Sequence, residues 1–291
     1  MLLATGLLIW ALVQSDQRLQ KTALLMIVIV TILGLPTYLT GNASEFLLLQ
    51  SGVELRGDLV NAHQNAAIRT LILMTFTGTF AWLGLWQFRR FSRPTTLNTR
   101  IVLGLSILTS ILILQTASLG GKISHPEVRT DAQESPLPEF TWWRTVVETY
   151  VSDESWVWPA AETLHFIGMT LVFGVALLVS LRMLGMMRGI PYRTIHRILP
   201  VGILGFVVNV ATGMLFFIAY PGLYVANAGF IIKVAAMVLT GFSVIYFTTF
   251  DEPWQVGPDQ AVRIRPKVIA ALTMVLLLTV MLFGRMIPFL S

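Results

Sequence analysis

Long apolar runs alternate with short polar segments along this chain of 291 residues. Most runs approach the roughly 20 residues that a helix needs to cross a bilayer. They predict spans over residues 22–40, 66–88, 101–119, 160–181, 198–220, 228–250 and 268–289. A further run, MLLATGLLIWALV, opens the sequence and is short for a crossing. It lacks the basic segment and the cleavage site of a signal peptide, so we interpret it as a first helix.

A polar connector divides these runs into two halves. The N-terminal half covers residues 1–128 and the C-terminal half covers residues 156–291. Between them, residues 129–155 are first acidic and then carry apolar and aromatic residues at helical spacing. This pattern predicts an amphipathic helix in the membrane interface. We therefore expect an all-α, polytopic membrane protein with about eight transmembrane helices in two four-helix halves.

The composition excludes several classes of protein. Hydrophobic residues make up 55% of the chain and charged residues 12%, about half the charge of an ordinary soluble domain. The absence of cysteine excludes disulfides, Cys-ligated iron–sulfur clusters and covalent c-type haem. A b-type haem, held only by axial side chains, stays compatible with the sequence.

Charge is distributed unevenly over the two sides of the predicted membrane. One set of loops carries thirteen basic and four acidic residues, whereas the opposite loops and helix ends carry six basic and eleven acidic residues. The thirteen basic residues of the first set of loops, which we call the basic set, are Arg18, Lys21, Arg89, Arg90, Arg93, Arg100, Arg182, Arg188, Arg193, Arg197, Arg263, Arg265 and Lys267. The positive-inside rule predicts that this side is cytoplasmic, with both termini periplasmic in a bacterial inner membrane. Topology explains the basic excess, so nucleic-acid binding is not expected.

The four histidines separate by membrane level. His63, His125 and His165 fall at the outer ends of predicted spans, whereas His196 falls in a predicted cytoplasmic loop. His63 and His125 belong to neighbouring helix ends, which suits the two axial ligands of a b-type haem. Gly120-Gly121, just before His125, would let the backbone approach a macrocycle or leave the helix. The alternative is that the glycines simply end a helix and the histidines are ordinary interface residues.

Basic side chains near these positions have several interpretations. Lys122 or Arg69 would neutralise haem propionates. Lys233 lies inside the 228–250 span, where an ionisable residue usually faces the bundle and pairs. Its expected partner is Glu162, a propionate or a quinone, and the alternative is snorkelling to the interface.

His165 is open to more than one role. It would be an alternative haem ligand, a ligand of a second haem or a hydrogen-bond donor to a quinone carbonyl. The structural alternative is a histidine whose hydrogen bonding is satisfied by Glu162 within the bundle. One Glu-x-x-His motif is too little for a di-iron site, which needs two. Asn209 is expected to bridge helices.

Two segments resemble known families. Residues 36–125 resemble an uncharacterised bacterial four-helix membrane family through Thr40-Gly41, His63 and the Gly120-Gly121…His125 segment. The resemblance implies a b-type cytochrome module with His63 and His125 as ligands. This chain lacks the family's additional histidines on its first helix, so the resemblance implies no second haem in that half.

Residues 156–250 are similar to another uncharacterised integral-membrane family. The shared features are WVWPAAETLHFIG, LRMLG, Ala211-Thr212-Gly213 and the segment 227–233. This resemblance implies functional roles for His165 and Lys233.

These features lead to three hypotheses about function. The first is an electron-transfer subunit that binds haem b near the periplasmic face and exchanges electrons with quinone or with membrane or periplasmic redox subunits such as c-type cytochromes. It would be one subunit of a larger complex rather than a stand-alone enzyme. The second is a cofactor-free anchor or assembly subunit. The third is a transporter of small solutes or metals. Against it, the sequence shows no evident pair of broken helices of the kind that transporters use.

Overall fold

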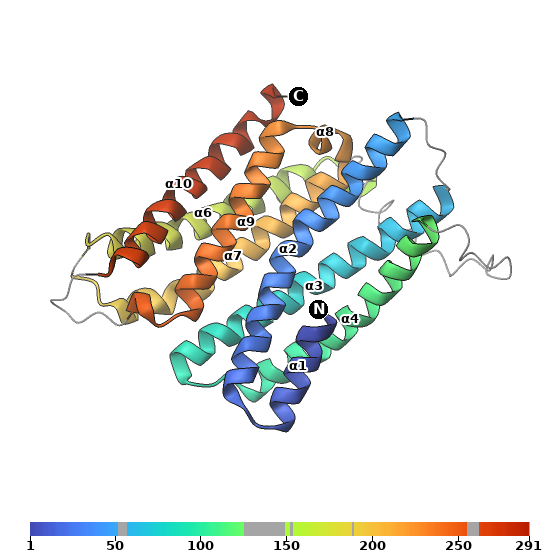
Figure 1. The fold of residues 1–291 in the computed structure, drawn as a ribbon. Helices are drawn as coiled ribbons and strands as arrows, with labels where there is room; N and C mark the ends of the chain where they lie inside the picture. Colours follow the sequence, from blue (N-terminus) through green and yellow to red (C-terminus); the bar gives the residue numbers. More distant parts are fainter. Residues whose placement is uncertain (52–56, 125–148, 152–153, 188, 255–261, 291) are drawn as a thin grey trace.

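The computed structural model describes residues 1–51, 57–124, 149–151, 154–187, 189–254 and 262–290 (Figure 1). Within these ranges the regular elements are all helical. The first half contains α1 (Leu2–Val13), α2 (Gln17–Gln50), α3 (Gly57–Phe91) and α4 (Thr96–Ser124). The second half contains α6 (Val157–Met183), α7 (Tyr192–Ala219), α8 (Pro221–Val225), α9 (Ala228–Thr249) and α10 (Ile264–Met286), with 3₁₀ turns at Glu252–Trp254 and Ile287–Phe289.

The membrane character predicted from the apolar runs is confirmed. Seven of the described helices are long and apolar enough to cross a membrane. The first apolar run is helical, but its 12 residues rise only about 18 Å, less than the hydrocarbon core of about 30 Å. Most other helices extend beyond the predicted spans, because polar residues at their ends continue the helix past the apolar run.

Two predicted features fall outside the part of the chain that the structure describes. His125 is one of them. The connector and interfacial helix predicted over residues 129–155 are the other, apart from a short helical piece at 149–151 and the approach to α6.

Successive long helices alternate in direction, so their connections gather at two ends of the bundle (Figure 1). The α1–α2, α3–α4, α6–α7 and α9–α10 connections lie at one end. We call it the basic end, because the basic set of the sequence lies in and beside these connections. We call the other end the far end. His63 and His165 both lie within the far-end turns of their helices.

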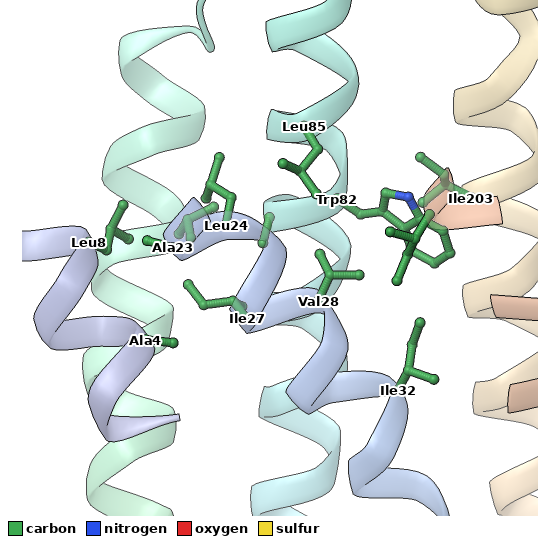
Figure 2. Packing of buried hydrophobic residues seen from close by; sticks show 13 residues of the cluster. Ala4, Leu8, Ala23, Leu24, Ile27, Val28, Ile32, Trp82, Leu85 and Ile203 are labelled. Atoms are coloured by element: carbon green, nitrogen blue, oxygen red, sulfur yellow. The ribbon is translucent and has the colours of Figure 1, made fainter. Parts of the chain in front are cut away.

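A buried apolar cluster organises the first half and reaches into the second (Figure 2). Leu8 of α1 and Leu24 and Ile27 of α2 are almost inaccessible. Trp82 of α3 and Ile203 of α7 complete the cluster across the boundary between the halves. Lipid tails are as apolar as these side chains, so close packing rather than exclusion of water holds the cluster together.

One stripe of α3 fastens the two halves together at the basic end. The stripe consists of Trp82, Trp86 and Arg89, whose spacings of four and three place them on one face of the helix. Its contacts are Trp82 Nε1 to Thr248 Oγ1 at 2.7 Å, Trp86 Nε1 to the His196 carbonyl at 2.9 Å, and Arg89 Nη1 to Asp251 Oδ1 at 3.1 Å. We call this stripe the α3 clasp.

Candidate functional site

His63 lies in the second turn of α3, and its ring rests against α4. Its Nδ1 is 3.0 Å from the carbonyl oxygen of Thr116. A Cβ atom added at Gly120 would lie 3.1 Å from His63 Cε1, tighter than an ordinary contact. Gly120 therefore gives the imidazole the room that it occupies beside the α4 backbone.

The Thr116 contact determines which ring nitrogen of His63 carries the proton. A backbone carbonyl only accepts hydrogen bonds, so Nδ1 is the donor and Nε2 of the neutral ring keeps its lone pair. Histidines that bind metals commonly donate their other ring N–H to a carbonyl in this way. The lone pair of the neutral His63 ring is therefore on Nε2.

The paired glycines do not end their helix, contrary to one reading of the sequence. α4 continues through Gly120 and Gly121 to Ser124, because glycine costs a helix only about 1 kcal/mol and packing against α3 offsets it. A Cβ at Gly121 would meet nothing within 4 Å, so only Gly120 is required by a close approach.

The two basic candidates near His63 take different positions. Arg69 donates from Nε to the carbonyl of Asn65 on its own helix at 3.2 Å. Six residues along a helix turn a side chain by about 120° from His63, so Arg69 lies on another face of α3. Lys122 is half-buried in the last turn of α4, two residues beyond Gly120.

A series of threonine contacts between α3 and α4 was not predicted. The hydroxyls of Thr70 and Thr116 are 2.9 Å apart, and those of Thr77 and Thr109 are 2.8 Å apart. With His63, the two α3 threonines repeat every seven residues, which keeps one stripe of α3 facing α4. The seven-residue spacing on both helices is the sequence signal that would have found this interface.

The second half holds a comparable histidine. His165 Nδ1 is 2.8 Å from the hydroxyl of Thr212, and the Asn209 side-chain amide donates to the His165 carbonyl at 3.0 Å. The ring also meets the edge of Phe216, with centroids 5.7 Å apart. The prediction that Asn209 bridges helices is confirmed.

The Thr212 contact indicates which ring nitrogen of His165 carries the proton. The Thr212 hydroxyl donates to the Val208 carbonyl at 2.7 Å, so it accepts from His165 Nδ1. In the neutral ring Nε2 is then an acceptor, not a donor.

Lys233 does not pair with Glu162. Glu162 is exposed, and among the described residues Lys233 has neither an ion pair nor a hydrogen bond. The Lys233 stem instead runs along Gly284 of α10, where an added Cβ would lie 3.5 Å from Cδ, Cε and Nζ.

The prediction that His196 lies in a loop is wrong. It belongs to the first turns of α7, which begins after Pro191, and only 6% of its surface is exposed. Its ring stacks on Trp86 with centroids 6.2 Å apart and meets Trp254 edge-on at 5.2 Å. Its Nε2 is buried without a hydrogen-bond partner. Both tryptophans come from distant parts of the sequence, so no local pattern announced this burial.

No group of three or more His, Asp or Glu side chains within the described ranges could hold a metal ion. A b-type haem brings its own four nitrogen ligands and needs only two axial ligands from the protein.

Comparisons of the chain with protein-family models, curated proteins and solved structures gave no significant match.

Proposed function

We propose that this protein is an electron-transfer subunit that binds a b-type haem at the far end of its first half, with His63 as an axial ligand. The observation that carries the proposal is the hydrogen bond from His63 Nδ1 to the Thr116 carbonyl. It leaves Nε2 as a lone-pair donor, the form in which imidazole binds iron.

One feature of the surroundings of His63 supports a haem ligand. Because Gly120 has no side chain, the His63 ring can lie directly against the backbone of α4. His125, the proposed second ligand, follows the last residue of α4 and lies beyond the described residues; His165 is the alternative. When bound, haem supplies a one-electron iron couple whose potential depends on its axial ligands and on burial.

The proposed location follows from charge. The basic end would face the cytoplasm of a bacterial cell by the positive-inside rule, so the far end and His63 would face the periplasm. We propose that a quinone of the membrane and a membrane or periplasmic subunit, such as a c-type cytochrome, are the electron partners at that face. Lys122, in the last turn of α4, is the proposed counter-charge for a haem propionate.

The test is a reduced-minus-oxidised visible spectrum of the full-length protein purified in detergent, with a pyridine haemochrome assay. We expect a b-type α-band with stoichiometric haem. His63→Gln and His125→Gln should each remove or shift this band, whereas His196→Gln at the basic end should leave it unchanged. Haem-free protein from cells with ample haem, or a band indifferent to both far-end substitutions, would contradict the proposal.

One observation favours a second candidate, a cofactor-free anchor or assembly subunit. His63 continues the seven-residue series of Thr70 and Thr77 that packs α3 against α4. A histidine in this stripe that served only helix packing would tolerate Gln without any spectral consequence. The same spectra therefore decide between the two candidates.

A further inference from the structure

Three arginines gather on two contacting helices at the basic end, one helix from each half of the fold. Arg90 is the penultimate residue of α3, and Arg193 and Arg197 belong to the first turns of α7. The hydrogen bond from Trp86 Nε1 to the His196 carbonyl, 2.9 Å long, fixes the two helices against each other here. Arg90 lies one turn beyond Trp86, and the two α7 arginines lie three residues before and one residue after His196. We call these three arginines the arginine seam.

The arginine seam has no acidic partner within the part of the chain that the structure describes. Arg193 and Arg197 are exposed and Arg90 is half-buried, and their side chains make no ion pair or hydrogen bond with a described residue. Arg89, next to Arg90, does pair with Asp251. Like charges at one place repel one another, so an anion between the three arginines would be stabilising. The positive-inside rule explains why arginines occur at this end, but not why two helices bring three of them together.

An exposed apolar surface continues from the arginine seam into the membrane. Val201 and Leu204 follow Arg197 at spacings of four and three residues, so the three share one face of α7. Val201 is 43% exposed and Leu204 is 56% exposed. At a rise of 1.5 Å per residue, Leu204 lies about 10 Å deeper in the membrane than Arg197. A ligand on this face therefore meets guanidinium groups at one end and apolar side chains at the other.

We propose that the arginine seam binds the headgroup of cardiolipin, an anionic phospholipid with two phosphates, and that its acyl chains lie along Val201 and Leu204. A guanidinium group is planar and donates two parallel hydrogen bonds to a phosphate, so arginine suits this role better than lysine. Basic pockets between transmembrane helices bind headgroups of this kind. Three positive charges are also neutralised more fully by two phosphates than by one.

The apolar surface favours a lipid over an acidic soluble protein. A soluble partner could contact the arginines, but it would not reach Leu204 within the membrane. The bound lipid would join α3 to α7 and so hold the two halves together beside the α3 clasp. The arginine seam lies at the opposite end of the bundle from His63, so this inference does not rest on the proposed electron-transfer function.

The test is native mass spectrometry of the full-length protein in detergent, titrated with cardiolipin, phosphatidylglycerol and phosphatidylcholine. We expect cardiolipin to bind most tightly and the zwitterionic phosphatidylcholine least tightly. The combined substitutions Arg90→Gln, Arg193→Gln and Arg197→Gln should weaken cardiolipin binding about a hundredfold, because each arginine near a phosphate contributes somewhat less than a factor of ten. Equal affinities for cardiolipin and phosphatidylcholine would overturn the proposal.

A charge-matched control tests whether total charge alone attracts the lipid. Arg263→Gln, Arg265→Gln and Lys267→Gln together remove three charges at the same end of the bundle, where they lie along the start of the single helix α10. This control variant should bind cardiolipin nearly as tightly as the unmodified protein. An equal loss of affinity in the two triple variants would show that the arginine seam is not a site.

A second variant keeps the test decisive if the glutamine variant of the arginine seam does not fold. Arg90→Lys, Arg193→Lys and Arg197→Lys together keep every charge that directs topology but remove the guanidinium groups, and should still weaken cardiolipin binding. Unchanged binding in this lysine variant would contradict the proposed contacts.

Two competitors separate a lipid from other anions. Glycerol 1-phosphate, which has a phosphate but no acyl chains, should not displace cardiolipin, and displacement would assign the arginine seam to a free phosphate. Polyglutamate should bind more weakly than cardiolipin. Tighter binding of polyglutamate, lost in the glutamine or lysine variant, would assign the arginine seam to an acidic protein instead.

Discussion

Two helical hairpins of this protein present a histidine at the far end, and they are built differently. In α3–α4 the helices meet through hydroxyl pairs, Thr70–Thr116 and Thr77–Thr109. In α6–α7 the backbones themselves meet. A Cβ added at Gly205 would lie 2.8 Å from the carbonyl oxygen of Gly168.

Both constructions answer the same physical problem. Lipid provides no hydrophobic drive for helices to associate, so they use small residues or side-chain hydrogen bonds. Each hairpin also ends in a histidine whose Nδ1 donates to the neighbouring helix, to a carbonyl for His63 and to a hydroxyl for His165. The orientation of the histidine is therefore the same whether the helices pack through hydroxyl pairs or through glycines. The two histidine sites differ in the residues that surround the ring.

The largest expected effect comes from separating the glycine-packed hairpin. Gly205→Leu would place a side chain 2.8 Å from the Gly168 carbonyl and 2.9 Å from the Val172 amide, and neither backbone can yield unless the helices part. We expect a loss of stability of about 3 kcal/mol. Thermal unfolding in detergent measures it. The control is Gly174→Leu on α6, where an added Cβ meets nothing within 4 Å. Equal melting of the two variants would contradict the role of the glycine contact.

An intermediate effect should distinguish the two histidines through their glycines. Gly120→Ala brings a Cβ to 3.1 Å from the His63 ring, whereas Gly213→Ala brings one only to 3.7 Å from the His165 ring. If His63 binds haem, Gly120→Ala should strain the ligand by about 1 kcal/mol and lower haem occupancy or shift the α-band. Gly213→Ala should leave the spectrum as it is. A spectral change in the second variant alone would move the haem to His165.

The smallest effect should come from the threonine-packed hairpin. The single substitutions Thr77→Val and Thr109→Val, combined in a double-mutant cycle, should reveal a coupling of about 0.6 kcal/mol. Thr170→Val, which removes only a hydroxyl bonded within α6, serves as the control paired with Thr109→Val. Coupling as large in the control cycle would show that the measured term does not belong to the hydroxyl pair.

The helices could be predicted from the sequence because bilayer thickness sets the length of an apolar run. The level of His63 and His165 followed from the same runs. The ends of the helices did not, because α3 starts at Gly57 with a polar turn that hydropathy assigns to a loop.

The environments of individual residues depended on contacts between distant segments. Trp86 and Trp254 bury His196 from positions 110 and 58 residues away, so its neighbours in sequence, among them Arg193 and Arg197, suggested exposure. Lys233 and Glu162 were expected to pair because their depths match. Depth does not determine which way a helix face points, and Glu162 points outward.

The α3 clasp has a consequence for the order in which the protein is made. Synthesis proceeds from the N-terminus, so α3 is inserted before the ribosome has reached Thr248 or Asp251. During that interval Trp82, Trp86 and Arg89 lack the partners that they have in the finished fold. The newly inserted first half therefore carries an unpartnered face until α7 and α9 have been made.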